Sequence, residues 1–115
     1  MGTIGDSSGN IPLDPQAFYK EKLDKSIHLF EKSLDGYQNA EFAAKRDQYK
    51  KVMKEALLVM NEAAKAILNS KTKNEAAHLK QDYEELIAKK DSTEKVSEED
   101  VHQLTRELKR LKNSF

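Results

Sequence analysis

Apolar residues recur every three or four positions through most of this 115-residue chain, the spacing that places them on one face of an α-helix. Such a face is stable only when it is buried against another element. Charged residues make up 35% of the sequence and apolar residues 37%, a balance that suits slender helices with large solvated faces. The sequence therefore predicts an all-α protein, folded as an antiparallel bundle of four amphipathic helices.

The N-terminal residues lack this periodicity. Residues 1–12 contain three of the four glycines and one of the two prolines. They are predicted to form a disordered arm or an expression remnant, and 13–115 a single helical-bundle domain.

The first helix is predicted to begin where Asp14 can cap it and Pro15 fits its first turn. It is expected to end near Asp35, because Gly36 offers a left-handed stop. The second helix is expected to begin with Asn39 as its cap and to continue to Ile67. Its apolar stripe includes one charged residue, and its members are Phe42, Arg46, Tyr49, Met53, Ala56, Met60, Ala63 and Ile67.

The junction between the second and third helices can be interpreted in two ways. Thr72 and Glu75 have the spacing of a capping box, which predicts a turn and a new helix there. The polar run 69–74 contains no glycine or proline, so the alternative is a three-helix bundle in which these two helices are fused. The last helix has the clearest start, because Ser97 can cap it and three acidic residues follow.

Several classes of function are disfavoured by the composition. The chain has no cysteine, so thiolate nucleophiles and cysteine-containing zinc sites are excluded. Its formal net charge is zero, which provides no overall attraction to nucleic acid. No glycine-rich phosphate loop, signal peptide or membrane-spanning stretch is recognised. We therefore expect a cytoplasmic protein with no enzymatic activity, no cofactor, no membrane span and no small-molecule substrate.

Two Glu-x-x-His pairs are the sharpest candidates for metal binding: Glu75 with His78, and Glu99 with His102. Helical bundles that hold two metal ions use this spacing on two helices. Both histidines lie off the apolar stripes, however, and both glutamates fall in first helical turns, where acidic residues are ordinary. The sequence therefore predicts no metal site.

The strongest candidate surface is a basic stripe at four-residue spacing, Arg46, Lys50 and Lys54, which is followed by Leu58 on a charged face. The absence of catalytic groups favours a non-catalytic helical protein–protein interaction module, either an adaptor, a chaperone-like protein or a self-associating unit. The alternative is a weak nucleic-acid or anionic-surface binder that uses the basic stripe.

Overall fold

The computed structural model describes residues 14–115, which form four α-helices and no β-strand. The predicted arm, 1–12, lies outside the described residues. The helices are α1 (Pro15–Asn39), α2 (Ala43–Ala66), α3 (Ser70–Tyr83) and α4 (Glu98–Lys112), and a π-helical segment, η2 (Glu84–Ala88), extends α3. The predicted four-helix bundle is confirmed. No helix within 14–115 combines the length and apolar character needed to cross a membrane.

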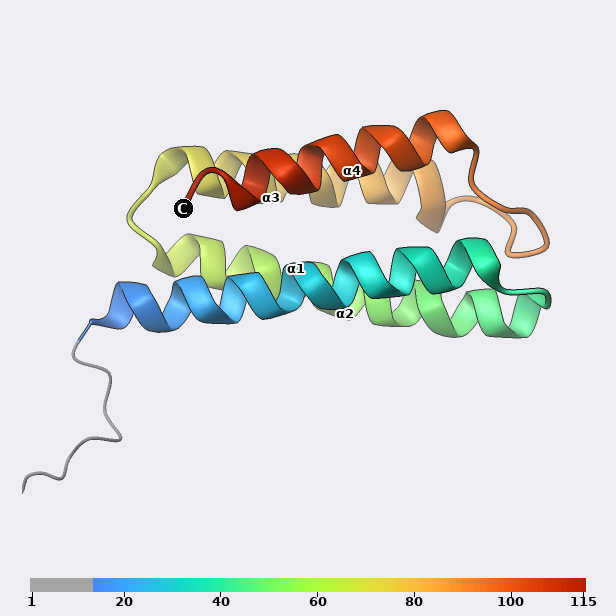
Figure 1. Cartoon of the computed structure of the whole chain (residues 1–115), viewed down its shortest axis with the longest axis horizontal. Coiled ribbons are helices and arrows are strands. Elements are labelled where there is room, and N and C mark those ends of the chain that lie inside the picture. Colours follow the sequence, from blue (N-terminus) through green and yellow to red (C-terminus); the bar gives the residue numbers. More distant parts are fainter. Residues whose placement is uncertain (1–13) are drawn as a thin grey trace, which may run out of the picture.

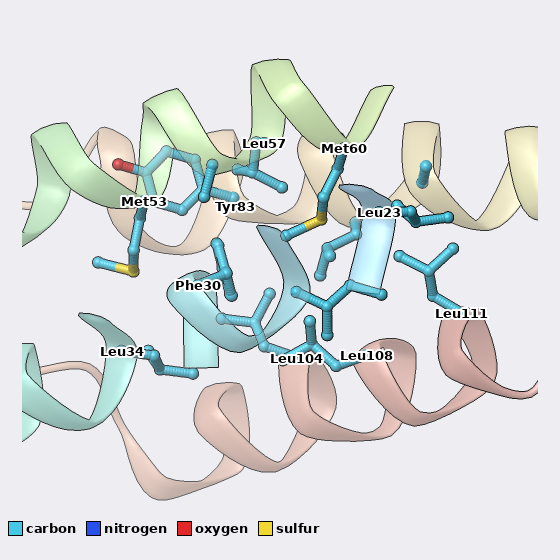
Figure 2. Close-up of a cluster of buried hydrophobic side chains, with 14 of the residues drawn as sticks. Leu23, Phe30, Leu34, Met53, Leu57, Met60, Tyr83, Leu104, Leu108 and Leu111 are labelled. Carbon is cyan, nitrogen blue, oxygen red and sulfur yellow. The ribbon is translucent and has the colours of Figure 1, made fainter. Parts of the chain in front are cut away.

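Consecutive helices run antiparallel, with α1 and α2 forming one layer and α3 and α4 the other (Figure 1). Side chains from all four helices meet between the layers, as Figure 2 shows for Phe30, Met60, Tyr83 and Leu104. The apolar stripes predicted from the sequence supply this core. Its largest fully buried side chains are Tyr37, Phe30, Leu23, Ile27, Met53, Leu57, Met60, Ile67, Leu79, Ile87, Leu104 and Leu108.

The second and third helices are separate, so the fused alternative is wrong. Helix α2 ends at Ala66 and the chain turns through the buried, extended residue Ile67. Asn69, rather than Thr72, caps α3, because its side chain accepts hydrogen bonds from the backbone NH groups of Lys71 and Thr72. Reversal at this point lets the stripes of both helices bury against each other, which one continuous helix could not do.

Thr72 has a different role from the predicted cap. Its side chain is fully buried in the first turn of α3, and its hydroxyl lies 3.0 Å from the carbonyl oxygen of Ser114. The Asn69 amide donates to the same carbonyl at 2.7 Å. The start of α3 is therefore tied to the C-terminal end of the chain. By contrast, Ser97 caps α4 as predicted, accepting from the backbone NH of Asp100.

The predicted end of the first helix is also wrong, because α1 continues through Gly36 to Asn39. The continuation buries Tyr37, which extends the apolar stripe and donates its hydroxyl to the carbonyl of Glu94. Asn39 is therefore the last residue of α1 and not a cap for α2. The N-cap position of α2 is Phe42, which is 72% exposed instead of joining the core stripe.

Gly36 allows close packing of α1 against α2. A β-carbon at this position would lie 2.5 Å from the ring atoms of Tyr49. Alanine is intrinsically about 1 kcal/mol better than glycine within a helix. Forcing an extra carbon into a packed contact costs about 1–3 kcal/mol. The close approach of Tyr49 therefore decides whether a substitution of Gly36 raises or lowers the stability.

We expect Gly36→Ala to lower the free energy of unfolding by about 1 kcal/mol, because the clash exceeds the gain in helix propensity. In a Tyr49→Ala background the clash is absent, and the same substitution should raise stability by about 1 kcal/mol. Urea unfolding of wild type, the two single variants and the double variant measures the coupling energy between positions 36 and 49. Equal effects of Gly36→Ala in both backgrounds would show that the contact does not constrain the helix pair.

Candidate functional site

The basic stripe predicted on the second helix is not a continuous cationic surface. Arg46 is only 6% exposed, and its guanidinium donates to the carbonyls of Ala40, Ser92 and Thr93. These carbonyls belong to the turn after α1 and to the connection before α4. Arg46 therefore does not face solvent. Its hydrogen bonds link the α1–α2 connection to the segment before α4 at one end of the bundle.

Lys50 is also engaged within the protein. Its side chain is half-buried, and the ammonium group donates to the carbonyl of Lys90, just beyond η2. In return, the Tyr83 hydroxyl donates to the Lys50 carbonyl at 2.9 Å. Burial raises the pKa of Tyr83 to about 12, so the phenol remains a neutral donor at physiological pH. Lys50 thus joins α2 to the end of α3.

Lys54 and Leu58, the other two residues of the predicted surface, lie together in the groove between α2 and α3. Leu58 is 48% exposed, as its charged helix neighbours suggested. The two residues line a hollow of 270 Å³, here called the α2–α3 hollow. Its walls are formed by Lys54, Leu57, Leu58, Lys80, Tyr83, Glu84 and Ala88.

A second hollow of 270 Å³ lies on the other side of α2, between that helix and α1. This α1–α2 hollow contains Leu29, which is 46% exposed, and Val59, the neighbour of Leu58 in the chain. Its walls are formed by Lys22, Lys25, Ser26, Leu29, Glu55, Ala56 and Val59. Helix α2 is thus flanked by two shallow hollows with apolar floors, and lysines outnumber glutamates around them by two to one.

A different kind of site lies between α3 and α4. His78 and Asp82 are one turn apart on α3 and face Glu107 on α4. The imidazole Nδ1 is 3.5 Å from Glu107 Oε1, and its Nε2 is 3.7 Å from Asp82 Oδ1. We call these three residues the His78 cluster.

Glu107 is fully buried within this cluster. Burial, together with the hydrogen bond and the negative charge of Asp82, raises the pKa of its carboxyl group to about 8. The pKa of Asp82 is lowered, first by its hydrogen bond with Glu107 and also by the Gln103 amide, which donates to Oδ2 at 2.8 Å. The two carboxyl groups therefore differ in protonation near neutral pH, with Asp82 ionised and Glu107 largely protonated.

Only one member of this cluster was among the candidate ligands predicted from the sequence. His78 belongs to the Glu75–His78 pair, but Asp82 and Glu107 were not recognised, and Glu99 and His102 are exposed elsewhere on α4. One signal was available. Glu107 lies three residues after Leu104 and four before Leu111, on the buried stripe of α4, where a charged residue is unusual.

Comparison with known proteins identifies no relative of this chain: no family model, no curated protein and no solved structure matches it.

Proposed function

We propose that this protein is a non-catalytic interaction module that binds an amphipathic helix of a partner protein across the outer face of α2. The observation that carries the proposal is the pair of hollows on either side of α2, with Leu58 and Leu29 exposed at their edges. A partner helix in such a groove is recognised by apolar residues at three- and four-residue spacing.

The size of the hollows favours side chains of a protein partner over a free small molecule. Each hollow has a volume of 270 Å³, whereas pockets for drug-sized ligands usually measure about 300–1,000 Å³. A hollow of this size suits one or two aliphatic or aromatic side chains. Two such hollows beside one helix suit the successive anchors of an amphipathic helix.

The charges around the hollows favour a partner with acidic flanks. Lys54 and Lys80 border one hollow and Lys22 and Lys25 the other, against one glutamate in each. A twofold dimer through this face would bring the same excess of lysine to both sides of the interface, which is unfavourable. The lysine excess therefore favours a different, acidic partner over self-association.

Nucleic-acid binding through the basic stripe has less support. A phosphate contact needs a cation that can reach the backbone of the nucleic acid. Arg46 and Lys50 instead donate to backbone carbonyls of the protein, so that only Lys54 of the three is exposed.

The π-helical segment η2 forms part of the wall of the α2–α3 hollow. Glu84 and Ala88, its first and last residues, both line the α2–α3 hollow. Single π-helical turns are uncommon and are frequent at functional sites. The irregular turn thus borders the same surface as Leu58.

Selection from a displayed library of helical peptides tests the proposal without knowledge of the natural partner. We expect enriched peptides to have apolar residues at i, i+3 or i+4 and i+7, with Asp or Glu on the flanks. Replacing Leu58 by aspartate should weaken their binding by at least about tenfold, or about 1.4 kcal/mol, because it adds a charge to the apolar edge and repels acidic flanks.

Leu68→Asp is the matched control. Leu68 is 88% exposed and does not line either hollow, so its substitution should leave peptide binding unchanged. Neither variant should alter the free energy of unfolding by more than about 0.5 kcal/mol, since both leucines are exposed. Equal binding of the selected peptides to wild type and Leu58→Asp would refute docking beside α2.

A further inference from the structure

The His78 cluster is a polar group within the largely apolar contact between α3 and α4. The neighbouring contacts of these helices are made by Leu79, Tyr83, Leu104, Leu108 and other buried apolar residues. Two carboxylates and an imidazole at such a position need a physical reason, because charged side chains are almost never fully buried unless they are paired.

Glu107 is the member of the cluster whose carboxylate oxygens receive no hydrogen bond from a neighbouring donor in the described part of the chain. Both of its carboxylate oxygens are buried, and neither accepts a hydrogen bond from residues 14–115. His78 Nδ1, at 3.5 Å from Oε1, is farther away than in an ordinary hydrogen bond. Asp82 supplies no donor of its own: the hydrogen bond between the two carboxyl groups uses the proton of Glu107, which a bound metal ion would displace. The Glu107 oxygens therefore lie among other acceptor groups, in a position where a cation would satisfy them.

We propose that His78, Asp82 and Glu107 bind a divalent transition-metal ion of the zinc class. One imidazole nitrogen and two carboxylate oxygens are three ligands of a kind that Zn²⁺ accepts. Mg²⁺ and Ca²⁺ take oxygen ligands, which makes the histidine a poor choice for them. The proposal is independent of helix docking, because none of the three residues lines the hollows beside α2.

The distances suit an ion after a small adjustment. One candidate ligand atom from each residue lies within 4.8 Å of the other two. Bonds of about 2.0–2.2 Å in a tetrahedral site place ligand atoms about 3.4 Å apart. The imidazole can supply this adjustment, because its side chain is 52% exposed. Its exposure also gives an ion access from solvent and leaves room for a water ligand.

Neighbouring groups would orient the ligands. The Gln103 amide donates to Asp82 Oδ2 and leaves Oδ1 facing His78. Outer partners of this kind hold metal ligands in position. The side chain of Arg110 lies 3.7 Å from Glu75, which directs part of its positive charge toward that carboxylate.

Titration of metal-free protein with Zn²⁺, followed by calorimetry, tests the proposal. We expect binding of one ion per chain, and a thermal midpoint that rises with Zn²⁺ concentration. Glu107→Gln and His78→Ala should each weaken Zn²⁺ binding by at least about tenfold. Glutamine keeps the shape of Glu107 and can donate to Asp82, so that variant should stay folded. Mg²⁺ should bind far more weakly than Zn²⁺.

His102→Ala is the matched control, since His102 is exposed on α4 and belongs to the other Glu-x-x-His pair. It should bind Zn²⁺ like wild type. Nitrogen chemical shifts of the imidazoles should assign the bound nitrogen to His78. A dissociation constant weaker than about 1 mM would overturn the proposal. So would unchanged binding in Glu107→Gln, or an equal loss in His102→Ala, and the cluster would then be a carboxyl pair sharing a proton.

Discussion

Arg46→Ala should lower the free energy of unfolding by about 3 kcal/mol. The guanidinium is buried and donates to three backbone carbonyls in two separate connections, and its distance to the Ala40 carbonyl is 2.6 Å. A hydrogen bond to a charged group contributes about 1.5–3 kcal/mol, and carbonyls that lose a buried donor retain a desolvation cost. We expect a total loss smaller than the sum of these separate losses, because water can enter at the end of the bundle and hydrate the carbonyls.

Two controls separate the fork-like donor geometry from charge alone. Arg46→Lys keeps the positive charge but not the planar guanidinium, so it should recover only part of the lost stability. Arg106→Ala removes an exposed arginine from α4 and should change stability by no more than about 0.5 kcal/mol. Urea unfolding measures all three. If Arg46→Ala were as mild as Arg106→Ala, Arg46 would not fasten the connections.

Glu107→Gln should stabilise the metal-free protein at high pH. The ordinary pKa of the carboxyl group is 4.5, and burial and the negative charge of Asp82 raise it to about 8 in the folded protein. Between these values the folded state retains a proton that the unfolded state releases. The free energy of unfolding therefore falls as pH rises through this window, and the loss is complete above about pH 8.

Glutamine is neutral at every pH and removes this penalty. One pKa unit corresponds to about 1.4 kcal/mol. We expect Glu107→Gln to exceed wild type in stability by on the order of 3 kcal/mol at pH 9 and to match it near pH 5. The charged groups that face Glu107 are His78 and Asp82 from α3 and Arg110 from α4. Because both proteins contain them, the difference between the two pH profiles isolates Glu107.

Urea unfolding between pH 5 and pH 9, with a chelator present, provides the comparison. Glu62→Gln is the control, because Glu62 is exposed on α2 and its profile should run parallel to that of wild type. Parallel profiles for wild type and Glu107→Gln would contradict a raised pKa for the buried carboxyl group.

The helical periodicity of the apolar residues predicted the core because residues at this spacing share the helix face that packs against the other helices. On α1, for example, Leu23, Ile27, Phe30 and Leu34 follow one another at steps of four and three residues, and all four are buried. Element ends were less predictable, because local signals compete with packing. Gly36 permits a helix stop, but burial of Tyr37 favours continuation. Similarly, Thr72 could cap a helix, yet Asn69 caps it and Thr72 contacts the C-terminal end instead.

The candidate sites depended on contacts that a linear pattern does not contain. Arg46 occupied both an apolar stripe and a basic stripe in the sequence, and only the position of its carbonyl acceptors distinguishes the two roles. The His78 cluster required the pairing of α3 with α4, which brings Glu107 to His78 across 29 residues of sequence. Leu58 was predictable because its exposure follows from its own helix neighbours.

Docking of a helix beside α2 is tested most directly by nuclear magnetic resonance of the labelled protein titrated with a selected peptide. We expect amide shifts to change around Leu58, Lys80 and Ala88 and around Leu29 and Val59, which line the two hollows. Amide shifts around Arg106 on α4 and around Asn113, just after that helix, should remain unchanged. Shifts concentrated on α4, or shifts beside α2 that persist in full in Leu58→Asp, would contradict the proposed function.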